Sequence, residues 1–130
     1  MDYQAVRQNM VEHQIRPNRV TDAGVIAAMA EVPREMFVPE EVASIAYVDE
    51  AAPLGNNRYL MEPSLLARIL QGAQISSDDV VLSIGCGTGY AAAILAKVAK
   101  AVVAVEVSSE LAEKASALMV ELGIDNAVVI

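Results

Sequence analysis

The chain has 130 residues, of which 55% are hydrophobic and 20% are charged, and its formal net charge is −8. This composition predicts a folded acidic domain and excludes a disordered chain. It also argues against nucleic acid as a partner, because phosphate neutralisation needs a basic surface, and no apolar run reaches the length of a membrane span.

The single cysteine and the single histidine limit the chemistry that we expect. Cys86 has no second cysteine for an internal disulfide, and the polar first residues do not have the pattern of a signal peptide. We therefore expect a cytoplasmic protein in which Cys86 is a small buried residue. His13 has no histidine or cysteine cluster near it in the sequence, so we expect no metal site.

The N-terminal part of the chain predicts short helices separated by prolines. Residues 2–15 carry apolar side chains at helical spacing and predict a helix that ends at Pro17. The Thr-Asp pair at residues 21–22 predicts the cap of a second helix, which Pro33 ends. The Pro-Glu-Glu sequence at residues 39–41 predicts the start of a short third helix.

A loop and a further helix come next. Residues 47–61 contain proline, glycine and asparagines and predict an ordered loop with a brief hairpin. Pro63 predicts the start of a helix that continues to about Ala73. We expect four apolar side chains of this helix to be buried, namely Leu65, Leu66, Ile69 and Leu70.

The most informative feature is a strand, a glycine turn and a helix in direct succession. The apolar run Val80–Ile84 predicts a buried strand, and it stops at Gly85, Gly87 and Gly89. Residues 91–97, which follow, are strong helix formers. Glycine is needed where a side chain would collide with a ligand or forbid the dihedral angles of the turn. Such a turn is how α/β proteins bring their backbone close to a nucleotide-like ligand.

An acidic residue follows the next strand at a sequence spacing that is typical of nucleotide-binding folds. Residues 101–105 predict a second buried strand, and Glu106 lies 21 positions after Gly85. That spacing is close to the offset of about 20 residues at which an acid meets ribose hydroxyls. A dinucleotide fold would have its third glycine where Tyr90 stands, which disfavours a nicotinamide enzyme. With Gly89 instead, the loop looks like the S-adenosylmethionine loop of class I methyltransferases, although a tight turn that binds nothing is the alternative.

The remainder of the sequence predicts one more helix and one more strand. The helix begins at Ser108 or Ser109 and reaches Gly123, which is suited to the C′ position. Residues 126–130 predict a third strand. The succession of strands and helices predicts an α/β fold.

Several segments resemble one family, the protein-L-isoaspartate (D-aspartate) O-methyltransferases. They are spread over essentially the whole chain and stand in family order. The element Val-Pro-Arg-x-x-Phe-Val-Pro is the most specific of them. The segments are Met10–Ile15, Val32–Pro39, Ala46–Asp49 and Pro53–Gly55, together with the glycine loop and Glu106.

The resemblance implies a Rossmann-like class I methyltransferase fold with an N-terminal helical extension. Residues 1–52 would form the extension and residues 53–130 the first half of the methyltransferase domain, with a sheet cut after about three strands. The family transfers a methyl group from S-adenosylmethionine to the carboxyl group of L-isoaspartyl residues in damaged proteins, which is protein repair. The residues expected to bind the cofactor are Ser83, Gly85, Cys86, Gly87, Thr88, Gly89, Tyr90 and Glu106. For Tyr90, a role as a packing residue at the helix start is the alternative.

The chain departs from the family pattern at the substrate side. Where the family has threonine and serine, this chain has Tyr59 and Met61, and methionine cannot donate a hydrogen bond to a carboxylate. Arg58 could bind that carboxylate instead, or it could be a solvated surface charge. Arg58, Tyr59 and Met61 are therefore the candidate catalytic residues. Ser83 stands where the family has an acidic residue, which would weaken the hold on the polar end of the cofactor.

The resemblance also implies that family members continue beyond Ile130. An end at this residue would leave Val80–Ile84 as an exposed apolar edge. We expect either a fragment of a longer enzyme or a homo-oligomer that covers this edge, and we expect the chain alone not to be competent for methyl transfer. Two other functions stay open: a catalytically silent relative that binds the cofactor, and a methyltransferase with another acceptor.

Overall fold

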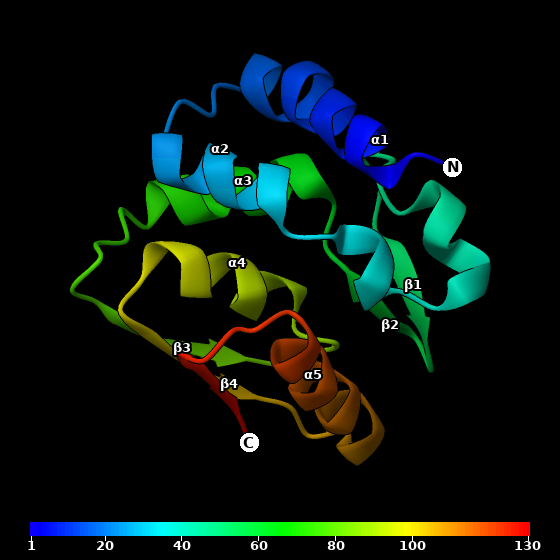
Figure 1. Ribbon diagram of the computed structural model, residues 1–130, viewed down its shortest axis with the longest axis vertical. Coiled ribbons are helices and arrows are strands. Elements are labelled where there is room, and N and C mark those ends of the chain that lie inside the picture. The colour runs from blue at the N-terminus through cyan, green and yellow to red at the C-terminus, as the bar shows by residue number, and fades with distance from the viewer. The chain divides into compact units, whose positions relative to one another are not determined.

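The computed structural model describes all of residues 1–130, and the chain divides into two compact units, Met1–Gln74 and Ile75–Ile130 (Figure 1). The first unit is helical with a small hairpin, and the second is a parallel sheet with two helices. The sequence analysis expects a helical extension to end at residue 52, whereas the first compact unit ends at Gln74. The expected boundary refers to the fold of the family and not to compact units, and it stays a prediction. None of the helices combines the length and the apolar composition that a membrane span requires.

The first unit consists of short helices and one hairpin. In chain order it contains α1 (Tyr3–Met10), the π-helix η1 (Val11–Ile15), the 3-10 helix η2 (Arg16–Asn18), α2 (Ala23–Glu31), the 3-10 helices η3 (Arg34–Phe37) and η4 (Glu40–Ile45), β1 (Ala52–Gly55), β2 (Arg58–Leu60) and α3 (Pro63–Gly72).

The helix boundaries follow the capping residues that the sequence contains. The Asp22 carboxylate accepts a hydrogen bond from the Val25 N–H at 3.0 Å, which confirms the predicted cap of α2. The first helix was expected to be uniform over residues 2–15, and the structure corrects this. It widens from α-helical to π-helical geometry at Val11 and then tightens into a 3-10 turn that ends beyond Pro17.

Only one face of α3 contributes to the core. Leu66 and Leu70 are buried, whereas Leu65 and Ile69 are 42% and 49% exposed. The expectation that all four are buried is therefore wrong for Leu65 and Ile69. These two side chains are four residues apart and share a strip of the helix that does not face the unit.

The hairpin predicted within residues 47–61 is present. β1 and β2 pair antiparallel, with Ala52 opposite Leu60. Asn56 and Asn57 at the turn have φ angles of 52° and 60°, as a turn with two left-handed central residues requires. Asparagine is one of the few residues that adopt this conformation at small cost.

The second unit is a three-stranded parallel sheet with its helices in the crossovers, which is the Rossmann-like arrangement expected from the sequence. In α5 the Ser108 hydroxyl accepts from the Leu111 N–H, and Gly123 beyond the helix end has a φ of 68°. The elements are β3 (Val80–Ile84), α4 (Tyr90–Val98), β4 (Ala101–Val105), α5 (Ser109–Glu121) and β5 (Ala127–Val129), and the strand order is β3-β4-β5.

The first strand of this sheet lies at an edge. β3 pairs with β4 only, and Val80, Leu82 and Ile84 are 66%, 61% and 77% exposed. The prediction of a buried strand is wrong for β3, because within its own unit the strand is paired along one edge only and these three side chains are exposed. The exposed apolar edge that the sequence analysis anticipated is present.

Candidate cofactor loop and acceptor hairpin

The glycine loop begins where β3 and β4 end together. Ile84 lies opposite Val105 in the parallel register. The N–H groups of Gly85 and Cys86 both donate to the Val105 carbonyl, at 2.7 and 3.1 Å. Because the two strands end at the same level, the residue after each strand meets the other at the carboxyl edge of the sheet. This register explains why an offset of 21 residues brings Gly85 and Glu106 to one place.

Glu106 holds the loop through its carboxylate. Its Oε1 accepts a hydrogen bond from the Gly87 N–H at 2.8 Å, and its Oε2 accepts one from the Ser108 N–H at 2.8 Å. The side chain is 6% exposed. The sequence-based expectation that Glu106 lies beside Gly87 is confirmed. The carboxylate thus lies between the turn after β3 and the start of α5.

The three loop glycines share a left-handed backbone conformation, and the surroundings of Gly85 and Gly89 differ. Gly85, Gly87 and Gly89 have φ angles of 74°, 59° and 95°, where other residues are strained. A Cβ on Gly85 would meet no atom within 4 Å, so open space lies beside it. A Cβ on Gly89 would lie 2.8 Å from the Met119 Cε and 3.2 Å from the Ala115 Cβ. The third glycine therefore allows α5 to approach closely, a reason that the sequence analysis missed although Ala115 and Met119 stand four residues apart on α5.

The loop residues differ in how far solvent reaches them. Cys86, Thr88 and Tyr90 are buried, Ser83 is half-buried and Gly85 is exposed. The burial of Cys86 agrees with the expectation of a small buried residue. Tyr90 is the first residue of α4 and is almost fully buried, which favours its packing role.

The candidate acceptor residues lie on the hairpin of the first unit. Arg58 and Tyr59 belong to β2, and Met61 follows it. The Tyr59 and Met61 side chains are 59% and 40% exposed, and Arg58 is half-buried. The structure thus brings these three residues together at one strand. It brings the glycine loop and Glu106 together in the other unit.

The sequence analysis did not predict two sets of hydrogen bonds at the base of this hairpin, one made by Arg34 and one by Asp49. Each set is called a tie below. Arg34 is fully buried; its Nε donates to the Ala46 carbonyl and its Nη2 donates to the Met61 carbonyl at 3.0 Å. The Asp49 carboxylate accepts from the Ser64 N–H at 3.0 Å and from its hydroxyl at 2.6 Å, so it caps α3. The signal for the first of these contacts was an arginine in the short segment between Pro33 and Pro39.

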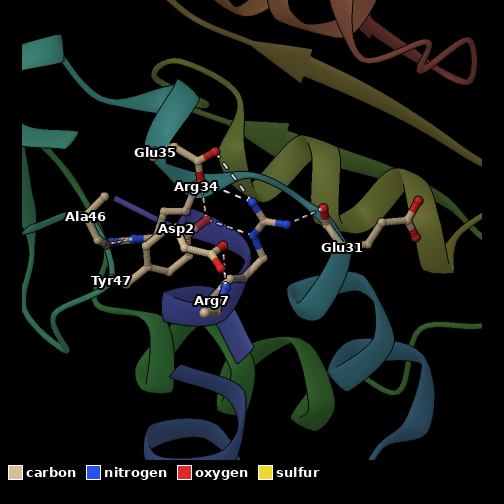
Figure 2. Close-up of polar contacts among 8 residues, drawn as sticks. Asp2, Arg7, Glu31, Arg34, Glu35, Ala46 and Tyr47 are labelled. Carbon is tan, nitrogen blue, oxygen red and sulfur yellow. Dashed lines mark hydrogen bonds and ion pairs between the residues drawn. The ribbon is translucent and has the colours of Figure 1, made fainter. Parts of the chain in front are cut away.

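A second polar cluster joins α1 to the segment around residue 47 (Figure 2). Arg7 Nε donates to the Tyr47 hydroxyl at 2.8 Å, and its Nη2 lies 3.3 Å from a Glu35 oxygen, which also accepts from the Tyr47 hydroxyl. Burial raises the pKa of Tyr47, and the Glu35 carboxylate raises it further. Burial lowers the pKa of Arg7, but the bond to Tyr47 and the Glu35 charge outweigh it and leave the pKa above its ordinary value. The cluster is structural, since its partners satisfy one another.

The fold and the loop geometry define a class of protein, and comparison with known proteins identifies the family. A parallel sheet with a glycine loop at its carboxyl edge, held by an acid at the end of the next strand, defines a Rossmann-like nucleoside-binding class of protein. The family model of protein-L-isoaspartate(D-aspartate) O-methyltransferase matches residues 5–130. The chain belongs to this family.

Two curated relatives illustrate the match. The chain is 41% identical over 124 residues to protein-L-isoaspartate O-methyltransferase 1 of Rhodopseudomonas palustris, covering 95% of this chain and 51% of the relative. It is 40% identical over 122 residues to protein-L-isoaspartate O-methyltransferase of Picosynechococcus, covering 94% of this chain and 55% of the relative. The chain thus spans about half the length of the curated relatives that it matches.

Solved structures agree on the fold. A protein-L-isoaspartate O-methyltransferase superposes with a TM-score of 0.80 at 29% identity, covering 95% of this chain and 41% of that one. A second structure, from Plasmodium falciparum and in complex with S-adenosyl-L-homocysteine, superposes with a TM-score of 0.74 at 18% identity. It covers all of this chain and 62% of its own, and at that identity it supports the fold alone.

Proposed function

We propose that this protein takes part in S-adenosylmethionine-dependent methyl transfer to the carboxyl group of L-isoaspartyl residues in damaged proteins. The family and the names of its relatives support the reaction class. The observation that carries the cofactor assignment is the contact of Glu106 with Gly87 at the carboxyl edge of the sheet.

The chain's own residues fit the nucleoside part of such a cofactor. The Glu106 carboxylate accepts the Gly87 and Ser108 N–H groups, and it lies at the carboxyl edge of the sheet, where an acid is expected to meet ribose hydroxyls. The open space beside Gly85 allows a ligand to approach the backbone. When bound, the cofactor supplies an already activated methyl group. We assign its binding to the residues expected from the sequence, with Gly89 and Tyr90 acting through the shape of the loop.

For the carboxylate that accepts the methyl group, the main requirement on the protein is correct orientation. A carboxylate is ionised at neutral pH, so no strong general base is needed. The protein must hold the carboxylate in line and keep water away. We propose Arg58 as the charge-assisted partner of the acceptor carboxylate, with Tyr59 and Met61 beside it on the exposed side of the hairpin.

A second function is favoured by the side chains on the hairpin. The exposed aromatic and thioether side chains of Tyr59 and Met61 stand where the family has hydroxyl groups. They fit a relative that binds the cofactor without isoaspartyl activity, or one that methylates a different acceptor. In both cases Glu106 keeps its role.

We propose a cytoplasmic setting with isoaspartyl-containing proteins or peptides as partners and neither nucleic acid nor a membrane among them. The lone buried cysteine supports the compartment, and the net charge of −8 supports the partner class.

Calorimetry with S-adenosylhomocysteine tests the cofactor assignment. Wild type is expected to bind, and Glu106→Ala is expected to lose about tenfold or more in affinity, because hydrogen bonds to a carboxylate are lost. Glu110→Ala, at an exposed acid in the first turn of α5, is the matched control and should stay within about twofold. Wild type that does not bind would overturn the assignment. Cofactor binding without any binding of an isoaspartyl peptide would favour the second function.

A further inference from the structure

The hairpin that carries Arg58 and Tyr59 is too small to hold its own position. β1 and β2 have four and three residues. An isolated two-stranded hairpin is marginally stable in water. Its buried pair, Ala52 and Leu60, lies at its base. The orientation of the hairpin therefore depends on what fixes the two chain ends that enter and leave it.

One buried side chain connects both of these chain ends. Arg34, from η3, donates through Nε to the Ala46 carbonyl before the hairpin and through Nη2 to the Met61 carbonyl after it. The Asp49 carboxylate also bonds to Ser64, which joins the segment between Ala46 and β1 to the first turn of α3.

Only arginine satisfies this geometry. Its guanidinium offers donors at fixed, separate positions, whereas the lysine ammonium offers its donors from a single point. Because Arg34 and Ala46 are both fully buried, the Ala46 carbonyl could not turn to water if it lost its donor.

We propose that Arg34 is a positioning residue for the acceptor hairpin: by bonding the main chain at Ala46 and Met61, it sets the position of Arg58 and Tyr59. The expected effect on substrate binding rests on the proposed function. The two hydrogen bonds from Arg34 to the main chain do not depend on it, because they are seen in the structure. Arg34 has no contact with reacting atoms in this account.

Hydrogen exchange of the intact chain tests the tie. In Arg34→Lys, amides of residues 52–61 are expected to exchange about tenfold faster, while those of α2 stay within about twofold. Arg16→Lys is the matched control, because Arg16 lies on the surface in an exposed ion pair with Glu12, and its hairpin exchange should equal that of wild type. Unchanged hairpin exchange in Arg34→Lys would overturn the proposal, and so would an equal increase in α2.

A wild-type measurement decides the matter if the variant does not fold. The Nε–H of Arg34 is expected to exchange far more slowly in ¹⁵N NMR than that of Arg16, and equal rates would overturn the tie. Titration with an isoaspartyl peptide then separates the two claims. Weaker peptide binding by Arg34→Lys, with unchanged affinity for S-adenosylhomocysteine, supports positioning. Peptide binding that is absent already in wild type contradicts the proposed function, while the exchange data still decide the role of Arg34.

Discussion

Replacing Gly89 by alanine tests why the third loop glycine is present. The new Cβ would lie 2.8 Å from the Met119 Cε and 3.2 Å from the Ala115 Cβ, at a φ of 95°. The Met119 end can move aside, but Ala115 belongs to the body of α5 and must shift. Backbone strain and overpacking together should cost about 2–4 kcal/mol. At about 4 °C per kcal/mol for a chain of this size, the melting temperature should fall by about 8–16 °C.

Two other glycine-to-alanine variants separate the two contributions. At Gly85 a Cβ meets nothing within 4 Å, so Gly85→Ala should show backbone strain alone, about 1–2 kcal/mol. Gly72 lies in α3 with open space around it, and Gly72→Ala should stabilise by about 0.4–1 kcal/mol. Urea unfolding followed by circular dichroism measures all three. If Gly89→Ala costs no more than Gly85→Ala, the close approach of α5 is not the reason for the glycine.

Three further predictions follow from the open edge and the buried tyrosine. Wild type should self-associate through the exposed edge of β3. Leu82→Lys should abolish this association in sedimentation experiments, because a charge on an edge strand blocks pairing. A wild-type monomer at micromolar concentration would contradict the prediction. The isolated chain should give no robust methyl transfer to an isoaspartyl peptide, because the β3 edge beside the loop is open to water; efficient turnover would refute this. Because the pKa of Tyr47 is raised in the folded state, the folded chain keeps this proton when the unfolded chain loses it, so stability should fall as the pH rises above about 10. Tyr47→Phe should make that fall shallower in urea unfolding at about pH 8 and about pH 11, and an identical slope would contradict the assignment.

Local signals in the sequence predicted most elements and their caps. Asp22, Ser108 and Gly123 act through contacts within a few residues, so their roles follow from the chain itself. The meeting of Glu106 with the loop could also be predicted, because parallel strands of equal length end at the same level.

Other features depend on contacts with parts of the chain that are distant in sequence. A local sequence pattern carries no information about such contacts. Leu65 and Val80 are apolar and were expected inside, but each is exposed because its own unit does not cover it. The role of Gly89 depends on α5, and that of Arg34 on two carbonyls distant in sequence. The family resemblance marked Arg34 as notable without giving its physical task.

The most direct test of the account is a titration of the ¹⁵N-labelled chain with S-adenosylhomocysteine, followed at individual amides. The account predicts that the largest shifts occur at Gly85, Gly87 and Ser108, because the last two donate to the carboxylate that would receive the ribose. The Glu106→Ala variant should lose these shifts. Saturable binding that leaves these amides unmoved, or an unaltered response in the variant, would contradict it.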